Sequence, residues 1–283
     1  MKPEPGTGRP WVLITGCSTG LGRALVGALR ERGWGVVASA RQPSTLETLA
    51  PGANLRTLAL DVTSAGSIAR AREQCRDLRL VAVVNNAGYG QMAPLELLES
   101  EELRRQFETN VIGLQAVTNA FLPLIRACAR PGEGRIVQVA SALGRMSIPL
   151  SGAYNASKHA VVALAETLRL ELGRDIPVLL VEPGVLETRW RATLARTWGD
   201  LPRRALGTPY QAIIQRYQEA GQGFAGEHGM SAEACAARIA GAMGRRHPPA
   251  RLVIGLDSFW FQLAHRWVPA GLMRAVLRRR YGL

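Results

Sequence analysis

The chain has few aromatic residues and few charges, and these shortages exclude whole classes of protein. Of its 283 residues only 6% are aromatic and 20% are charged, whereas 47% are hydrophobic. That apolar content is enough to fill a core and too high for a disordered chain. No apolar run reaches ~18 residues without a charge, so we expect no membrane-spanning helix. Residues 1–10 lack the apolar stretch of a secretory signal, which favours a cytoplasmic protein.

Cysteine and histidine are also scarce, and their spacing is uninformative. The four cysteines are scattered along the chain with no CxxC pair, at Cys17, Cys75, Cys128 and Cys235. The four histidines show no ligand spacing either. This pattern argues against a zinc site or a disulfide framework and favours a reducing compartment. We therefore expect no catalytic metal.

Lysine is almost absent from a strongly basic chain. Lys and Arg together number 35 against 22 Asp and Glu, a net charge of +13, yet Lys2 and Lys158 are the only lysines. The arginines are spread along the chain rather than gathered in a block with interleaved aromatic residues, so we expect no nucleic-acid partner. A lysine kept inside such a chain, at position 158, indicates a task that arginine does not perform.

Short apolar runs alternate with amphipathic segments for most of the length. Runs rich in Val, Ile and Leu predict buried strands at Trp11–Thr15, Gly35–Ser39, Leu55–Leu60, Leu80–Val84, Arg135–Ala140, Pro177–Val181 and Arg251–Ile254. The segments between them predict helices at Leu21–Arg32, Ser64–Arg76, Ser100–Ala129, Tyr154–Gly173 and Ser231–Arg245. This alternation predicts a single-domain α/β Rossmann fold, a doubly wound parallel sheet of seven strands with helices on both faces.

We expect one domain over residues 1–283, with three parts. Residues 9–184 form the cofactor-binding and catalytic core, and the long insertion 185–230, which contains several aromatic residues, is expected to cover the substrate as a lid. Residues 257–283 are a basic amphipathic extension. Two interpretations of this tail stay open: it packs on its own or a partner subunit, or it lies on a membrane with its arginines against anionic lipid.

A glycine-rich turn follows the first predicted strand directly and leads into a helix. Gly16, Gly20 and Gly22 allow the backbone to turn tightly and approach a pyrophosphate, to which the helix N-terminus offers free N–H groups. Cofactors with a free ribose 2′-hydroxyl usually meet an acidic residue after the second strand, but this chain has Arg41 there. A guanidinium suits a 2′-phosphate. We therefore predict NADP(H) as the preferred cofactor, with NAD(H) as the alternative.

A second group of residues has the chemistry of an acid/base site. Tyr154 and Lys158 lie four residues apart in a predicted helix and share one face. A free tyrosine has a pKa of about 10, and a nearby ammonium should lower it, which makes Tyr154 a candidate general acid/base. Ser141, just after the fifth strand, can donate to a substrate oxygen. Asn110 is mildly unfavourable inside a helix, which indicates either a specific role or a hydrogen-bonded core amide.

Together these motifs resemble the short-chain dehydrogenase/reductase family over roughly residues 10–190. The motifs TGCSTGLG, LDVT, NNAG, TNV, Ser141, YNASK and VEPG occur in that order. The resemblance implies a catalytic tetrad of Asn110, Ser141, Tyr154 and Lys158. We expect cofactor contacts from Gly16, Ser18, Thr19, Gly20, Leu21, Gly22, Arg41, Asp61, Val62, Asn86, Ala87, Gly88, Tyr154, Lys158, Pro183, Gly184, Val185 and Thr188.

The reaction implied by the resemblance is hydride transfer between a nicotinamide and the carbon of an alcohol or carbonyl group. Tyr154 would pass the proton on the substrate oxygen while Ser141 holds that oxygen. Lys158 would tune Tyr154 and bind the nicotinamide ribose, and Asn110 would hold a water that links Lys158 to solvent.

Several segments are similar to the branch of the family that contains 17β-hydroxysteroid and retinol dehydrogenases. These are NNAGYG, the GRM segment after Ser141, VEPG and the C-terminal region. That branch implies an apolar steroid-, retinoid- or lipid-like alcohol or ketone, and the family implies a homodimer or homotetramer. Candidate substrate-pocket residues are Ser141, Leu143, Met146, Ile148, Tyr154, Val185 and Trp190. Two alternative functions are a non-catalytic NADP(H)-binding regulator and a basic membrane-surface protein on the same scaffold.

Overall fold

Seven parallel strands form the central sheet of the computed structural model, which describes residues 8–187, 197–219 and 229–283. The strands are β1 (Trp11–Ile14), β2 (Gly35–Ala40), β3 (Leu55–Ala59), β4 (Leu80–Asn85), β5 (Arg135–Val139), β6 (Val178–Pro183) and β9 (Arg251–Ile254). Their order across the sheet is β3-β2-β1-β4-β5-β6-β9, so the winding reverses between β1 and β4. The predicted single-domain α/β fold with seven parallel strands is confirmed.

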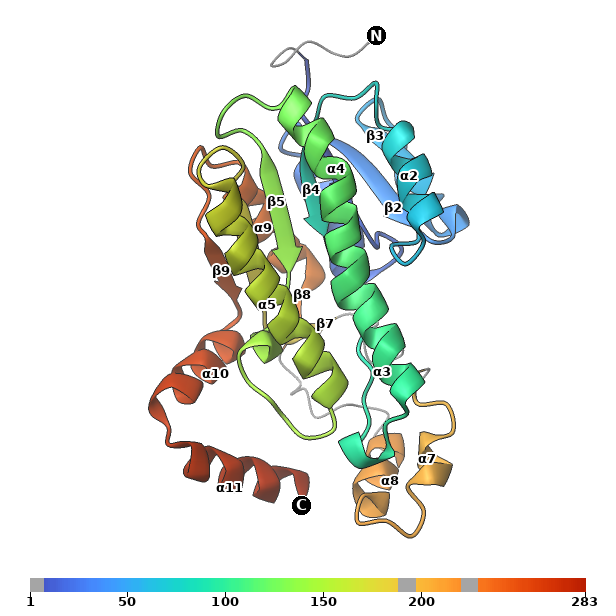
Figure 1. Ribbon diagram of the computed structural model, residues 1–283, viewed down its shortest axis with the longest axis vertical. Coiled ribbons are helices and arrows are strands. Elements are labelled where there is room, and N and C mark those ends of the chain that lie inside the picture. The colour runs from blue at the N-terminus through green and yellow to red at the C-terminus, as the bar shows by residue number, and fades with distance from the viewer. Residues whose placement is uncertain (1–7, 188–196, 220–228) are drawn as a thin grey trace.

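Helices cover both faces of this sheet (Figure 1). They are α1 (Gly20–Arg30), α2 (Ala65–Glu73), α3 (Ser100–Phe107), α4 (Leu114–Cys128), α5 (Gly152–Leu172) and α9 (Ala232–Met243). Helices α1 and α9 pack together on one face, and α2, α4 and α5 lie on the other. Three short 3-10 turns, η1 (Pro43–Leu46), η2 (Leu95–Leu97) and η4 (Ala142–Gly144), lie in the connections.

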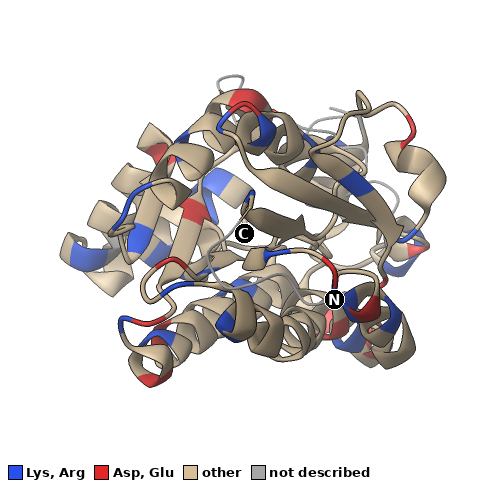
Figure 2. Cartoon of the chain, turned by 90° about the horizontal axis from the view of Figure 1, so that it is seen from above, with Lys and Arg blue, Asp and Glu red and all other residues tan. Residues whose placement is uncertain are grey.

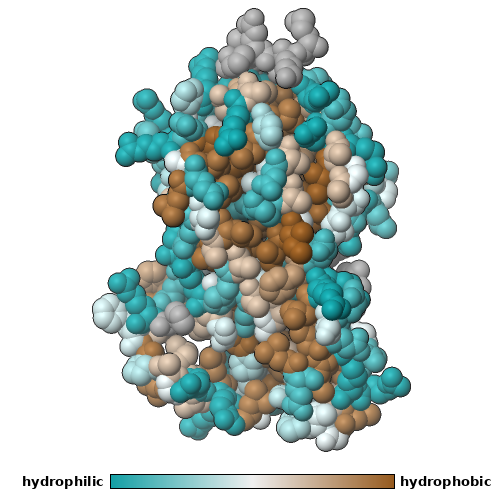
Figure 3. All heavy atoms as spheres, in the orientation of Figure 1, coloured by the Kyte–Doolittle hydropathy of each residue, from teal (hydrophilic) through white to brown (hydrophobic). Residues whose placement is uncertain are grey.

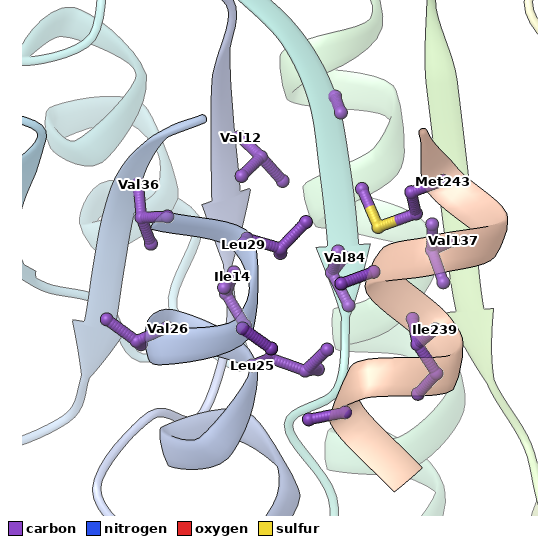
Figure 4. Packing of buried hydrophobic residues seen from close by; sticks show 14 of the residues in the cluster. Val12, Ile14, Leu25, Val26, Leu29, Val36, Val84, Val137, Ile239 and Met243 are labelled. Atoms are coloured by element: carbon purple, nitrogen blue, oxygen red, sulfur yellow. The ribbon is translucent and has the colours of Figure 1, made fainter. Parts of the chain in front are cut away.

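The hydrophobic core consists of two layers, one on each face of the sheet. Figure 4 shows the layer on the α1 and α9 side, where Ile14 of β1 lies beside Leu25 of α1, while Ile239 and Met243 project from α9. Val12 of β1 belongs to the same layer. Leu13, between those two β1 residues, belongs to the opposite layer. Successive strand side chains point to opposite faces, so a strand covered on both sides has an unbroken apolar sequence.

The four cysteines are all buried in or beside these layers. The Cys17 thiol donates to the backbone oxygen of Ile14 at 3.3 Å, directly beneath the turn that follows β1. Burial raises the pKa of the thiols of Cys17, Cys75 and Cys235 to about 12. These side chains serve as small apolar residues of the core.

The helix predicted over Ser100–Ala129 is not continuous. A π-helical segment, η3 (Glu108–Gly113), separates α3 from α4. At Gly113 a Cβ would lie 2.7 Å from the backbone oxygen of Val62, so the chain passes too close to that loop for a side chain. By length and composition Ser100–Cys128 is the one described stretch that could cross a membrane. In this fold Val117, Phe121 and Ile125 of α4 are fully buried against the sheet.

A lower part of the molecule follows β6 and contains a third apolar cluster. Its elements are β7 (Leu186–Glu187), α7 (Leu201–Arg204), α8 (Gln211–Glu219), β8 (Met230–Ser231), α10 (Leu256–Trp267) and α11 (Ala270–Tyr281). The cluster joins Trp198, Leu201, Ile213, Tyr217 and Tyr281. The insertion predicted at 185–230 therefore carries short helices where it is described. Figure 1 places the C-terminus at this lower end, whereas the described part of the chain begins at the upper end.

Charge and apolar surface are distributed differently over the molecule. Figure 2 shows basic and acidic residues spread around the periphery, so the excess of arginine is divided among several elements. In the lower part of Figure 3 apolar side chains reach the surface between hydrophilic ones. This is the appearance of amphipathic segments with one side turned to solvent.

Candidate active site

A cavity of about 870 Å³ lies at the carboxyl ends of the central strands. Its walls come from the glycine turn after β1, the loops after β4, β5 and β6, the start of α5, and the helices α10 and α11. In doubly wound sheets ligands bind at this edge, where the strand order reverses. One continuous space therefore connects the predicted phosphate turn with the lower apolar cluster.

Close backbone contacts shape the glycine turn. Gly16 has a φ of +74°, and a Cβ there would lie 2.9 Å from the Cα of Ala87. A Cβ at Gly22 would overlap the backbone oxygen of Gly16. The α1 helix begins beside the cavity, and the side chain of its N-cap, Thr19, makes no capping hydrogen bond. The turn can therefore admit a pyrophosphate and offer it the first N–H groups of the helix.

Two polar side chains tie this turn to the loop after β4. Thr15 Oγ1 accepts hydrogen bonds from the backbone N–H groups of Asn86 at 3.0 Å and Ala87 at 2.9 Å. Asn86 Nδ2 donates to the backbone oxygens of Thr15 at 2.9 Å and Gly16 at 3.2 Å. Sequence reasoning included Asn86 and Ala87 but missed Thr15. The available signal was a hydroxyl residue at the end of a buried strand, directly before the glycines.

The predicted adenosine side of the site contains Arg41, Asp61 and Val62, which all line the cavity. Asp61 Oδ1 accepts from the backbone N–H of Thr63 at 2.9 Å and from its hydroxyl at 2.8 Å, which fixes the loop after β3. Arg41 directly follows β2 and is exposed. Arg105 of α3 is a second cationic side chain on this wall. These donors suit an anionic group such as a ribose 2′-phosphate.

Ser141, Tyr154 and Lys158 come together where β5 and α5 meet. Lys158 Nζ donates to the backbone oxygen of Val139 at 2.8 Å and lies 5.7 Å from the centroid of the Tyr154 ring. Ser141 caps η4 by accepting from the N–H of Leu143 at 3.2 Å, and its side chain also hydrogen-bonds Tyr154. Tyr154 and Lys158 both line the cavity. The three residues can thus act on one substrate oxygen.

Burial shifts the pKa values of both Tyr154 and Lys158. It raises the pKa of Tyr154 to about 12, against a smaller opposing contribution from the Ser141 hydrogen bond. It lowers the pKa of Lys158 to about 8. The pKa of Tyr154 therefore lies above its ordinary value and not below it as predicted, because desolvation outweighs the hydrogen bond from Ser141.

The π-helical segment η3 brings Asn110 to the same region. Its Nδ2 donates to the backbone oxygen of Tyr89 at 2.9 Å and to the Ser157 hydroxyl at 3.1 Å, and its Oδ1 accepts from the N–H of Tyr89 at 3.1 Å. A Cβ on Gly88 would lie 3.0 Å from that Oδ1 and 3.7 Å from Lys158 Nζ. Asn110 is thus a buried, hydrogen-bonded side chain behind the cavity wall. Its role in holding a water stays a prediction.

The turn after β6 is held by the first residues of α10. Asp257 Oδ2 accepts from the backbone N–H of Val185 at 2.5 Å, and a Cβ on Gly184 would overlap the Asp257 carboxylate. Ser258 Oγ donates to the backbone oxygen of Glu182 at 3.0 Å. Sequence reasoning included Gly184 and Val185 and missed both α10 residues, since the partners are 72 and 76 positions apart.

A fully buried carboxylate, Glu182, links several walls of the site. Its Oε1 accepts from Arg145 Nε at 3.0 Å, and its Oε2 accepts from both Nε and Nη2 of Arg251, at 2.9 Å and 2.6 Å. Arg145 also contacts Glu166 of α5 at 2.5 Å, and Arg251 donates to Gln262 of α10 at 2.7 Å. This ion cluster joins the loop after β5, strand β9, α5 and the C-terminal helices.

The lower cavity wall contains most of the predicted substrate-pocket residues. Leu143, Met146, Ile148 and Val185 line it, whereas Ser141 is buried and is not part of the lining. Trp190, and Thr188 of the predicted cofactor contacts, lie outside the described residues. The structure adds residues that sequence reasoning did not place there, namely Met92, Thr197, Tyr217, Phe261, Leu277 and Tyr281. Half of these come from the C-terminal helices, because the tail folds back across the open end of the cavity.

One arginine of α7, Arg204, links this helix to α3. Arg204 Nη2 pairs with Glu102 Oε1 at 2.8 Å, and Arg204 Nη1 donates to the backbone oxygen of Leu97 at 2.6 Å. Gln91 Nε2 donates to the backbone oxygen of Thr197 at 2.9 Å. These contacts hold residues 197–204 of the predicted lid against the segment between β4 and α4.

Comparison with known proteins identifies the family. Residues 10–198 match the model of the short chain dehydrogenases. The chain belongs to the short-chain dehydrogenase family. It is 32% identical to a 3-ketodihydrosphingosine reductase from Bacteroides thetaiotaomicron, over 96% of this chain and 98% of that protein. It is 30% identical to retinol dehydrogenase 5 from Homo sapiens, over 94% of this chain and 87% of that protein. A short-chain dehydrogenase structure from Streptomyces avermitilis has a TM-score of 0.76 at 29% identity, covering 97% and 96% of the two chains.

Membership of this family confirms the resemblance found in the motifs. A short-chain dehydrogenase with relatives that are named as reductase and dehydrogenase is an NAD(P)-dependent oxidoreductase. The glycine turn fits such a dinucleotide by its geometry, because its glycines leave room where any Cβ would collide.

Proposed function

We propose that this short-chain dehydrogenase uses NADP(H) to interconvert a carbonyl and an alcohol on an apolar, steroid-, retinoid- or lipid-like substrate. The observation that carries the proposal is the single cavity that contains the glycine turn, Tyr154, Lys158 and an apolar lower wall. When bound, the cofactor supplies or accepts the hydride at its nicotinamide. The residues of the chain then hold the substrate and move its proton.

Tyr154 is the proton donor in the reduction direction. With a pKa of about 12 its hydroxyl stays protonated at neutral pH and can give its proton to a substrate oxygen that gains charge. Ser141, hydrogen-bonded to Tyr154, holds the same oxygen. Lys158, with a pKa of about 8, is mostly an ammonium at neutral pH and stabilises the phenolate left behind. In oxidation the same groups act in reverse.

The preference for NADP(H) depends on Arg41. The side chain directly after β2 is a guanidinium where an acid would repel a 2′-phosphate, and Arg105 adds a second positive charge to the same wall. The free 2′-hydroxyl of NAD(H) is uncharged, so neither Arg41 nor Arg105 would form an ion pair with it.

The apolar substrate class is supported by the lower wall and by the relatives. Leu143, Met146 and Ile148 come from the segment after β5, while Phe261 and Leu277 come from the C-terminal helices. The two relatives are named for a ketodihydrosphingosine and for retinol, and both of these molecules are lipids with a long hydrocarbon part. A pocket of this kind selects by size and apolar contact rather than by specific hydrogen bonds.

The test is a fluorescence titration with NADPH and NADH of the wild type, Arg41→Ala and a distant control, Arg70→Ala. We expect NADPH to bind ~10- to 100-fold more tightly than NADH, and only Arg41→Ala to lose that difference. A carbonyl screen with 3-ketodihydrosphingosine, retinal and steroid ketones, followed by NADPH consumption, tests the reaction. Equal affinity for both cofactors would remove the NADP(H) preference, and binding without turnover would indicate a regulator.

A further inference from the structure

The C-terminal helices expose an apolar surface that their own packing does not explain. Eight of the 13 exposed large hydrophobic side chains among the described residues lie between positions 256 and 283. Four of them, Leu256, Trp260, Leu263 and Trp267, follow one another at intervals of four, three and four residues and so share one face of α10. They are 79%, 60%, 36% and 71% exposed, and we call them the outer stripe.

The opposite side of the same helices is already occupied. Phe261, Leu277 and Tyr281 line the cavity, and Tyr281 is buried in the third apolar cluster. At the start of α10, Ser258 is fully buried and Asp257 accepts from Val185. The inner side therefore anchors the helices to the enzyme, and the outer stripe is a second apolar face. Figure 1 shows α10 and α11 running along the lower end of the molecule, away from the body of the sheet.

Positive charge is concentrated in the same two helices. Between residues 257 and 283 the chain has one acid, Asp257, whose carboxylate is held by the turn after β6. Against it stand five exposed arginines; Arg280 also lines the cavity, and the other four are Arg266, Arg274, Arg278 and Arg279. Exposed tryptophan and leucine on one helix face, together with several exposed arginines, are typical of helices that lie in the interface of a bilayer. Anionic headgroups would neutralise the arginines while the outer stripe enters the acyl boundary.

We propose that α10 and α11 dock on the surface of an anionic phospholipid bilayer through the outer stripe and these arginines. A second copy of the chain fits this face poorly, because a twofold contact would bring the arginine-rich helices of both copies together. The docked helices would separate the cavity from the lipid by one helix thickness, ~10 Å. An apolar substrate could then pass from the bilayer to Phe261 and Leu277 without crossing bulk water.

The first experiment measures co-sedimentation of the full chain with vesicles of phosphatidylcholine, with or without phosphatidylglycerol. We expect the wild type to bind the anionic vesicles and to bind the neutral ones much more weakly. The double variant Trp260→Gln/Trp267→Gln should bind at least ~10-fold less. The matched control Leu170→Gln/Leu206→Gln changes side chains that are 85% and 60% exposed elsewhere and should bind like the wild type.

The second experiment tests the charges. Arg274→Gln/Arg278→Gln/Arg279→Gln should bind anionic vesicles roughly 100-fold less tightly. Its matched control, Arg70→Gln/Arg76→Gln/Arg104→Gln, removes three exposed arginines from α2 and α3 or their ends and should change binding by no more than ~3-fold. Tryptophan emission should shift to shorter wavelength when the wild type binds, and this shift should vanish in the Trp260/Trp267 variant.

Each outcome decides the proposal. It is overturned if the wild type ignores anionic vesicles, if it binds neutral vesicles equally well, or if both arginine triples lose binding alike. It is also overturned if the tryptophan variant keeps vesicle binding and instead dissociates an oligomer in light scattering. Should that variant fail to fold, the arginine triples decide alone. Activity on a dispersed substrate without vesicles should stay within ~2-fold of wild type in all variants, so docking and the proposed reaction can fail separately.

Discussion

The two ends of the cavity are built by different means. At the glycine turn the shape comes from backbone atoms in close contact, as at Gly16 and Gly22, where no Cβ fits. At the lower end it comes from side chains of three separate segments, with Trp198, Tyr217 and Tyr281 packed in one cluster. A backbone-defined site tolerates almost no substitution, whereas a site made of apolar side chains can change shape with its sequence. One protein can thus keep its cofactor chemistry and vary its substrate.

The largest effect should appear where the two ends meet, at Tyr154. We expect Tyr154→Phe to reduce turnover about 1000-fold, because the proton donor is lost while the ring remains. NADPH affinity should change by no more than ~2-fold, which separates chemistry from cofactor binding. The control Tyr210→Phe, in the lower part, should keep nearly full turnover. Steady-state kinetics and cofactor titration measure both quantities, and similar turnover in the two variants would contradict the assignment.

Glu182 links the loop after β5, strand β9, α5 and α10, so its loss should weaken the whole fold rather than one end of the cavity. Glu182→Gln leaves Arg145 and Arg251 without their buried counter-charge, and we expect a loss of about 3 kcal/mol in the free energy of unfolding. Glu73→Gln removes an exposed pair with Arg76, in which both side chains are more than half exposed, and should cost less than about 0.5 kcal/mol. Urea unfolding measures both. Equal losses would mean that the ion cluster stabilises the fold no more than an exposed pair does.

Two glycines of α1 test whether the upper end is defined by backbone contact. Gly22→Ala would force a Cβ against the backbone oxygen of Gly16, and we expect a loss of about 2 kcal/mol together with weaker NADPH binding. Gly27, in the same helix, has open space around a Cβ, so Gly27→Ala should stabilise by about 0.5 kcal/mol or more. Thermal unfolding should show a lower melting temperature for Gly22→Ala and a higher melting temperature for Gly27→Ala. Two shifts in the same direction would refute the close-contact explanation.

The smallest effect should be a pH dependence confined to the upper end. Burial lowers the pKa of Lys158 to about 8. The side chain is therefore mainly a charged ammonium below about pH 8 and loses its charge as the pH rises above that value. If the ammonium helps to hold the cofactor, NADPH affinity should fall by up to ~10-fold per pH unit above about 8. Lys158→Met should bind more weakly and lose this dependence. A wild-type affinity that stays flat to pH 9, roughly one unit above that pKa, would contradict it.

The upper end was largely predictable from the sequence, and the reasons are local. Buried apolar runs identified all seven strands, and the glycine spacing identified the turn before any contact was known. Ser141, Tyr154 and Lys158 meet because they follow β5 and begin α5, so topology alone brings them to one edge. Their residue types are therefore sufficient to suggest the chemistry.

The lower end and the ionisation states were not predictable in the same way. Nothing in the sequence near Asp257 indicates that it binds Val185, because that contact depends on how the tail folds back. The π-helical segment that contains Asn110 ends where Gly113 passes close to Val62, and this contact depends on the tertiary fold. The raised pKa of Tyr154 depends on how much water the finished fold removes, and this cannot be read from the spacing of two residues.

The burial of every cysteine has a practical consequence for studying the C-terminal helices. Thiol reagents attack the thiolate, and the pKa of about 12 at Cys17, Cys75 and Cys235 keeps that form negligible at neutral pH. Cys128 is buried as well. A single cysteine introduced at exposed Ala275 of α11 should therefore be the one position that takes a maleimide dye in the folded protein. The protein can therefore be labelled at an introduced cysteine without first replacing its own four cysteines.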